Sequence, residues 1–143
     1  MDRRLPRGLR NNNPGNIRLS STRYQGEVPS TDKAFKQFRT MAYGYRAMFV
    51  LLYTYQKRYK RNTIEEMLNT YAPPCENNTN GYISRVAEES GVCATCHITT
   101  TNGDVMIPIV AAMSAVENGC PAIMRDVEQG WLLFINDYRN GKL

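Results

Sequence analysis

The sixteen residues from Asp104 to Gly119, DVMIPIVAAMSAVENG, decide which fold the chain can adopt. At helical spacing, one line of side chains is apolar up to its last member: Met106, Val110, Met113 and Glu117. The neighbouring line is apolar throughout: Val105, Ile109, Ala112 and Val116. A helix that is apolar on most sides belongs in a protein core. We therefore expect a buried helix over 104–118, capped by Asp104 and ended by Gly119, with Pro108 tolerated near its first turn.

Glu117 lies at the end of this predicted core helix. Removal from water disfavours a charged carboxylate, and so does the negative end of a helix dipole, so both raise the pKa of the side chain. A carboxylic acid that stays protonated near pH 7 can protonate the leaving oxygen of a glycoside. The pattern leaves two other interpretations open, because Glu117 can instead reach solvent or pair with an arginine. Arg46 is one candidate partner, and such a pair would lower the pKa of Glu117. The more ordinary expectation for Arg46 is a position on a solvated helix face.

Four further segments have helical patterns. Between 41 and 60, apolar side chains recur at spacings of three and four: Tyr45, Met48, Phe49, Leu52 and Tyr55. Thr63 and Glu66 have the spacing of a capping box, and the helix that they start should stop before Pro73. A helix that begins near 77–79 and ends at Gly91, and another over 122–138, complete the set.

The first forty residues have a different character. Residues 10–16, RNNNPGN, are types that favour turns, and Phe35 and Phe38 anchor a short extended piece. Residues 92–103 are expected to form a loop, which a short extended pair around Ile98 and Thr100 would fit. The sequence thus predicts a single domain, 1–143, of mainly α (α+β) class, with about five helices and a small irregular or β-containing N-terminal lobe.

Composition narrows the functional classes. A chain of 143 residues fits one hydrophobic core, and the formal net charge of +5 favours polyanionic partners such as anionic cell wall. The basic run 57–61 has no nucleic-acid motif beside it, so we expect a solvated helix face and no specific nucleic acid. No apolar run reaches the roughly 20 residues of a membrane span. Residues 1–6 lack the apolar core of a secretory signal, so we expect synthesis in the cytoplasm and delivery by a holin, virion or secretion machine.

The four cysteines allow several interpretations. Cys93-Ala-Thr-Cys96-His97 matches the pattern for c-type haem attachment, and His97 is the only histidine. The Cys-x-x-Cys spacing also suits zinc, with Cys75 or Cys120 as a further ligand. Free thiols or a local disulfide in a loop remain the favoured interpretation, with no metal and no cofactor.

Several short motifs carry a family resemblance. They are 10–18 (RNNNPGNIR), Tyr24-x-Gly26, the pair Phe35 and Phe38, 44–47 (GYRA), 71–82 (YAPPCENNTNGY) and Glu117-Asn118-Gly119. In these features the chain resembles phage and prophage virion-associated proteins that are described as structural or lytic. The motifs extend over nearly the whole chain.

The motifs are also similar to those of bacterial cell-wall glucosaminidases and lytic transglycosylases, but in rotated order. In those families a helix ending in Glu-Ser/Thr-Gly precedes the Asn-rich turn, whereas here the turn comes first and Asn118 replaces the Ser or Thr. The resemblance implies a circularly permuted, lysozyme-like domain, which is feasible when chain termini lie close together. It requires Glu117 to fold next to Asn12, Tyr71 and Tyr82.

The resemblance also implies roles for individual residues. Glu117 would be the general acid, and Tyr71 and Tyr82 would position the sugar or stabilise the charged transition state. Asn12, Asn13 and Asn16 would line the groove, although forming a turn is itself a sufficient reason for these three residues. Core packing is the corresponding alternative for the two tyrosines.

Hydrolysis requires a second carboxylate, for which Glu27, Asp32 and Glu76 are candidates. A lytic transglycosylase needs only one acid/base, because a hydroxyl of the sugar itself attacks. We therefore expect a peptidoglycan glycan-strand-cleaving enzyme of phage or prophage origin, either a lytic transglycosylase or a glycoside hydrolase of muramidase or glucosaminidase type. It would act as a monomer on peptidoglycan, at the cell wall or within a virion beside other virion proteins.

Two other functional classes remain. One is a non-catalytic virion or wall-binding module of the same fold. The other is a metal-dependent peptidase or redox protein built on Cys93, Cys96 and His97.

Overall fold

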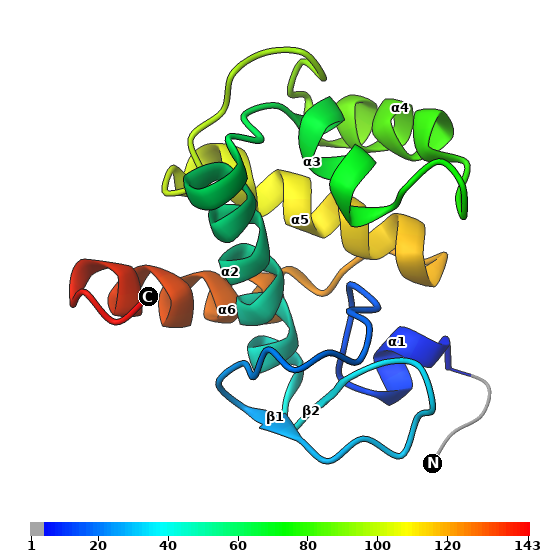
Figure 1. The fold of residues 1–143 in the computed structure, drawn as a ribbon, viewed down its shortest axis with the longest axis vertical. Helices are drawn as coiled ribbons and strands as arrows, with labels where there is room; N and C mark the ends of the chain where they lie inside the picture. Colours follow the sequence, from blue (N-terminus) through cyan, green and yellow to red (C-terminus); the bar gives the residue numbers. More distant parts are fainter. Residues whose placement is uncertain (1–4) are drawn as a thin grey trace.

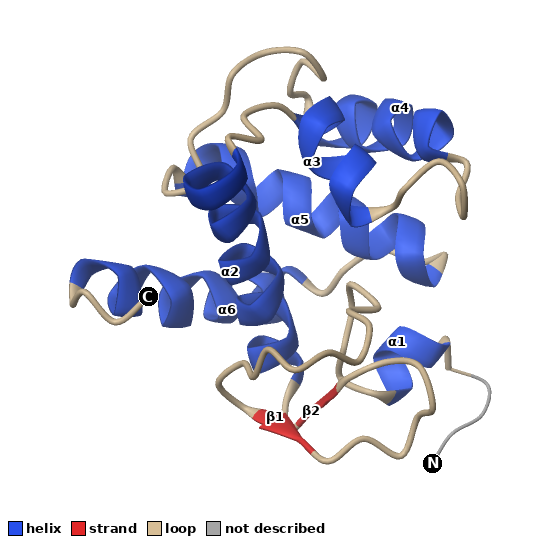
Figure 2. Cartoon of the chain, viewed as in Figure 1, coloured by secondary structure: helices blue, strands red, loops and turns tan. Residues whose placement is uncertain are grey.

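The structure is a computed structural model that describes residues 5–143 (Figure 1). Over these residues the chain forms six helices and two short strands, so it is mainly helical with a small β-containing lobe, as predicted (Figure 2). The elements are α1 (Arg7–Arg10), β1 (Glu27–Val28), β2 (Gln37–Phe38), α2 (Met41–Tyr59), α3 (Ile64–Tyr71), α4 (Thr79–Ser90), α5 (Gly103–Asn118) and α6 (Met124–Arg139). Residues 1–4, on which part of the signal-peptide expectation rests, lie outside the described chain. Among the described helices, none combines the length and hydrophobicity needed to cross a bilayer.

Helix α5 is the core helix that its sequence predicts. It lies between the α3–α4 pair and α1, and it packs against α4, α6, α2 and α1 (Figure 1). Its start differs from the prediction, because Asn102 rather than Asp104 is the N-cap and accepts a hydrogen bond from the backbone N–H of Asp104. Pro108 therefore lies beyond the first turn. Another residue here would donate its backbone N–H to the carbonyl of Asp104, but proline has no N–H to donate, and Asp104 is exposed to solvent. Gly119 ends the helix with a left-handed φ of 68°, as predicted.

The long helix α2 forms the second part of the core by packing against α6. Phe49 of α2 meets Trp131 edge-on, with ring centroids 5.1 Å apart, and stacks on Phe134 at 6.0 Å. The two helices approach closely at Gly130, where an added Cβ would lie 2.6 Å from the Cβ of Tyr45. Apolar side chains at helical spacing thus bury the expected face of each helix.

Two other helices begin as their sequences predict. The Thr63 hydroxyl accepts a hydrogen bond from the N–H of Glu66, while the Glu66 carboxylate accepts one from the N–H of Asn62. This arrangement is a capping box displaced by one residue. Asn78 caps α4, and Gly91 ends it with a φ of 73°. The loop expected over 92–103 is present over 92–102, since Gly103 already belongs to α5, and within it the structure has no extended pair at Ile98 and Thr100. Ile98 N–H donates to the Asn62 carbonyl instead.

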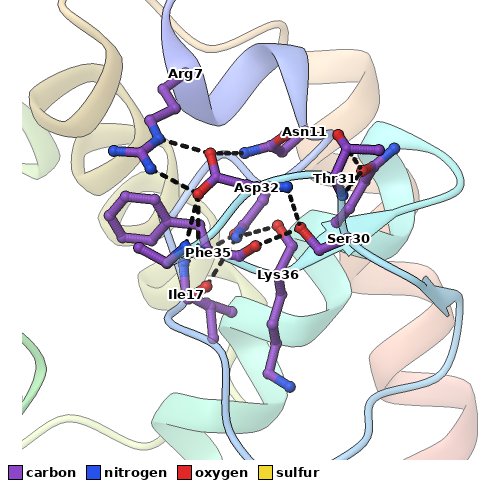
Figure 3. A network of polar contacts seen from close by, with 11 residues as sticks. Arg7, Asn11, Ile17, Ser30, Thr31, Asp32, Phe35 and Lys36 are labelled. Carbon is purple, nitrogen blue, oxygen red and sulfur yellow. Dashed lines mark hydrogen bonds and ion pairs between the residues drawn. The ribbon is translucent and has the colours of Figure 1, made fainter.

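The N-terminal lobe combines one turn of helix with a two-stranded antiparallel sheet, in which Glu27 pairs with Phe38. Helix α1 was not predicted, because four residues are too few to show helical periodicity. Figure 3 shows the polar network of this lobe. Arg7 makes two 2.6 Å contacts with the Asp32 carboxylate, and Asn11 donates to the same group. These contacts hold the pKa of Asp32 well below its ordinary value, mainly through the hydrogen bond from Arg7.

Lys36 is fully buried beneath this lobe. Its ammonium group lies 3.0 Å from Glu27 Oε2 and also donates to the carbonyls of Ser20 and Thr22. A buried charge requires a partner and further hydrogen bonds, and Lys36 has both. Lys36 and Glu27 therefore act as an internal support for the loop that joins Ser20 to Tyr24.

Candidate active site

Glu117 lies at the C-terminal end of α5, partly buried, where two side chains from distant parts of the sequence donate to its carboxyl group. The Asn16 amide donates to Oε1 and the Tyr82 hydroxyl donates to Oε2, both at 2.9 Å. Both carboxyl oxygens thus have a fixed partner. Neither of the alternatives for Glu117, a freely solvated side chain or a pair with Arg46, describes this arrangement.

Burial raises the pKa of Glu117 above its ordinary value. The hydrogen bonds from Asn16 and Tyr82 and the positive charge of Arg18 oppose this rise, because each favours the charged carboxylate. Loss of solvation is the largest of these effects. The site therefore holds a carboxylic acid whose proton is retained to higher pH than in water.

The Asn-rich turn is fixed against the end of α5 by the residue that follows Glu117. The Asn118 amide donates to the Pro14 carbonyl at 2.8 Å and to the Ser114 carbonyl at 2.9 Å. Asn16 itself has a left-handed φ of 49°, a conformation that asparagine tolerates better than most residues. The departure from Ser or Thr at position 118 thus has a structural role, since an amide can reach both carbonyls.

Helix α1 closes on the same junction through Gly8. A Cβ at this position would lie 2.5 Å from Asn118 Oδ1, 2.8 Å from the Asn13 carbonyl oxygen and 2.9 Å from Asn16 Oδ1. The side-chain oxygens of Asn118 and Asn16 are both buried and have no conventional hydrogen-bond donor in the described chain. The lack of a side chain at Gly8 thus lets α1 approach these two oxygens closely.

Tyr71 connects α3 to the same turn. Its hydroxyl donates to the Gly15 carbonyl, and loss of solvation raises its pKa well above the ordinary value. The pKa of Tyr82 is raised in the same direction, first by burial and then by the charge of Glu117. Both phenols thus stay protonated and remain hydrogen-bond donors.

A cavity of about 460 Å³, called here the main cavity, opens beside Glu117. This size is typical of small-molecule sites. Four aromatic residues line it: Tyr24, Phe35, Tyr55 and Tyr71. Polar side chains also line it: Asn16, Arg18, Ser20, Thr22, Thr70, Glu76, Asn77 and Glu117. Aromatic faces beside hydrogen-bonding groups suit a ligand with apolar ring faces and many hydroxyls, such as a sugar.

A second hollow, called here the side hollow, also borders Glu117. It has a volume of about 470 Å³, and Tyr82 and Arg85 are among its lining residues. Glu117 and Asn77 line both spaces. The acid thus borders two ligand-sized spaces.

The three candidate second carboxylates have different environments. Glu76 lines the main cavity, is 57% exposed and lies 3.8 Å from Arg18. Glu27 forms the buried pair with Lys36, Asp32 is held by Arg7, and neither lines the main cavity. The structure therefore brings Glu76, but not the other two, into the same cavity as Glu117.

The three asparagines proposed to line the groove also have different environments. Asn16 contacts Glu117, whereas Asn12 donates to the Phe38 carbonyl and Asn13 is fully buried, bonded to Ile17 and Lys36. Asn12 and Asn13 thus have the turn-forming role that remained open for them. The contact with Glu117 that the rotated motif order expects of Asn12 is made by Asn16 instead.

The structure also corrects the surroundings expected for Arg46. A solvated helix face was the ordinary expectation for this side chain, but Arg46 is 6% exposed and pairs with Asp137 of α6 at 2.8 Å.

Sequence patterns did not identify Arg18, Tyr24, Phe35 or Tyr55 as parts of a cavity, although Arg18 ends the motif that contains Asn16.

Cys93 and Cys96 are exposed free thiols on the loop before α5. A hydrogen bond from Cys96 lowers the pKa of Cys93 to about 7, with Thr95 contributing. Over residues 5–143 there is no cluster of three or more histidine, cysteine, aspartate or glutamate side chains that would hold a metal ion.

Fold and site together define a mainly helical protein with a partly buried carboxylic acid that borders two ligand-sized spaces. No protein-family model matches the chain. It is 34% identical over 130 residues to Protein P5 of Pseudoalteromonas phage PM2, an alignment that covers 87% of this chain and 79% of the phage protein. The chain therefore belongs to the family of this phage protein, which supports a phage origin.

Proposed function

We propose that this protein cleaves the glycan strands of peptidoglycan, with Glu117 as the general acid. The observation that carries the proposal is the position of Glu117, partly buried, hydrogen-bonded by Asn16 and Tyr82, and shared by the main cavity and the side hollow. A glycan strand that crosses both spaces would place a glycosidic oxygen beside the carboxyl group. Proton transfer to that oxygen makes it a better leaving group as the sugar gains positive charge.

The Tyr82 hydroxyl can hydrogen-bond to Glu117 whether the carboxyl group is charged or protonated. Its hydroxyl donates to Glu117 Oε2 at 2.9 Å and lies 3.5 Å from the Met113 carbonyl oxygen. When Glu117 is protonated, the hydroxyl can turn toward Met113 and accept a hydrogen bond from the acid. The same side chain therefore fits both protonation states.

The number of acidic groups bears on the type of cleavage. Glu76 is the candidate for a second catalytic carboxylate, since it shares the main cavity with Glu117. Its high exposure and its contact with Arg18 differ from the setting of Glu117. A reaction that needs one acid/base, as in a lytic transglycosylase, is therefore the form of the proposal that we favour.

The rotated motif order gains support from the contacts of α5. A lysozyme-like chain with the motifs in the other order would pass from the glutamate helix directly into the Asn-rich turn. Here Asn118 donates to Pro14, and α1 packs against α5, so a connection between those elements would be short. The end of α6 lies away from α1 (Figure 1), so α6 would be an addition to the permuted unit.

Digestion of purified sacculi tests the proposal. The wild-type protein is expected to release soluble fragments, and Glu117→Gln is expected to release almost none. Anhydro ends on the fragments would identify a transglycosylase, whereas reducing ends would identify a hydrolase and make Glu76→Gln equally inactive. Binding of sacculi without release by the wild-type protein would instead support a non-catalytic wall-binding or virion module.

A further inference from the structure

Arg18 is a cation beside the acid that the proposed cleavage does not use. Of the residues in 5–143 that line the main cavity, it alone is positively charged. Its charge reaches Glu117, because Arg18 is one of the influences that lower the pKa of that carboxyl. A guanidinium at this position favours the charged form of Glu117, whereas a general acid must stay protonated. Arg18 is therefore expected to have a function other than supporting the acid.

The backbone and the stacking of Arg18 fix it at the cavity wall. Arg18 forms an isolated antiparallel bridge with Phe35, and its guanidinium lies 5.6 Å from the centroid of the Phe35 ring. Arg7 lies over the same ring at 4.6 Å, but Asp32 takes up its charge through two 2.6 Å contacts. Arg18 has no comparable partner, since its described contact with an acid is 3.8 Å from Glu76.

The contact with Glu76 shows which group Arg18 is placed to bind. Both side chains are mostly exposed, at 67% and 57%, and both line the main cavity. An exposed pair at this distance is weak and exchanges easily for a better acceptor. A carboxylate on a ligand could make the planar two-point contact that guanidinium groups prefer.

We propose that Arg18 binds a carboxylate carried by the glycan strand, so that the main cavity selects an N-acetylmuramic acid unit over N-acetylglucosamine. This inference rests on the proposed substrate. N-acetylmuramic acid differs from N-acetylglucosamine by a lactyl ether that ends in a carboxyl group. That carboxyl is free in a naked strand and carries the stem peptide, with carboxylates of its own, in an intact one.

Binding to Glu117→Gln, which prevents turnover, tests the inference. Calorimetry would compare a naked tetrasaccharide of alternating N-acetylglucosamine and N-acetylmuramic acid, its stem-peptide form, and chitotetraose. We expect at least one carboxylate-bearing ligand to bind more tightly than chitotetraose. Adding Arg18→Gln should weaken that ligand about tenfold and leave chitotetraose unchanged. Preference for the naked strand would assign the lactyl carboxylate, and preference for the peptide form would assign the stem peptide.

Two further variants sharpen the test. Arg125→Gln removes the same charge from an exposed site on α6 and should change no affinity. Glu76→Gln removes the competing carboxylate and should tighten binding of the preferred ligand by about twofold to fivefold. Equal affinity for all three ligands, or an equal loss for all three on Arg18→Gln, would overturn the proposal. Selective binding by a protein that cleaves no sacculi would overturn the enzyme proposal and leave the role of Arg18 intact.

Discussion

The Asn16 amide donates to the Glu117 carboxyl at 2.9 Å across a sequence separation of 101 residues. This contact joins the turn near the start of the chain to the end of the core helix α5. Asn118 reinforces the junction by donating to the Pro14 carbonyl. The position of the acid thus depends on two segments that only the folded chain brings together.

Replacing Glu117 with Gln should stabilise the protein at neutral pH. Burial raises the pKa of Glu117, so the folded state binds a proton more tightly than the unfolded state. The stability that this proton contributes is present at low pH and is lost as the pH rises through the folded pKa. We expect Glu117→Gln to unfold with a free energy about 1 kcal/mol higher at pH 8, and with no advantage near pH 3. Denaturant unfolding of both proteins at both pH values measures this difference. A gain in unfolding free energy from Gln that is smaller at pH 8 than at pH 3 would contradict the prediction.

Replacing Tyr82 with Phe should move the basic limb of the pH–rate profile to higher pH. The Tyr82 hydroxyl lowers the pKa of Glu117 by donating to the charged carboxylate. Without it the acid stays protonated at higher pH, although the maximum rate is expected to fall. Tyr71→Phe is the matched control, because that hydroxyl donates to Gly15 and should leave the limb in place. Equal shifts in the two variants would argue against the role of Tyr82.

Replacing Lys36 with Met should destabilise the fold by about 3 kcal/mol, because it removes the buried cation from the Glu27 carboxylate. The Tyr24 N–H and the exposed Arg23, 4.0 Å away, are the partners that remain. The double variant Glu27→Gln/Lys36→Met should recover much of that loss. Chemical unfolding of both variants checks this coupling. If Glu27 is structural, as its position indicates, the double variant also retains cleavage of sacculi, whereas a catalytic Glu27 would make it inactive.

Replacing Gly8 with Ala should disturb the junction of α1, α5 and the Asn-rich turn. The added Cβ would fall within 2.9 Å of three oxygen atoms, from Asn118, Asn13 and Asn16. We expect a loss of about 1–3 kcal/mol in unfolding free energy and a lower cleavage rate, because Asn16 would move relative to Glu117. A variant with unchanged stability and rate would show that α1 does not position the site.

The sequence predicted the elements whose signals are local. Apolar spacing marked α2 and α5, and the cap at Thr63 and the stop at Gly119 follow from residue types whose backbone preferences are strong. Helix α1 has no such signal, since one turn shows no periodicity. Asn102 and Asp104 have similar capping ability, so residue type alone does not place the N-cap of α5, and only the path of the loop distinguishes the two residues.

The site was less accessible to sequence reasoning, because its contacts are long-range. The apolar line of α5 drew attention to Glu117, and the resemblance added Tyr82 and Asn16. Nothing local distinguishes Asn16, which reaches the acid, from Asn12 and Asn13, which hold the turn. Likewise, telling Glu76 from Glu27 as the candidate second carboxylate depends on the burial of Lys36 beside Glu27. No sequence pattern indicated that burial.

The rate of fragment release from purified sacculi, compared between wild type and Glu117→Gln, tests the central claim most directly. Glu128→Gln, which changes an exposed acid on α6 that lines neither space, serves as the control. We predict that Glu117→Gln lowers the rate by about 10²–10⁴-fold while the folded state is retained and the control keeps the wild-type rate. Equal release by wild type and Glu117→Gln would contradict the assignment of Glu117 as the acid.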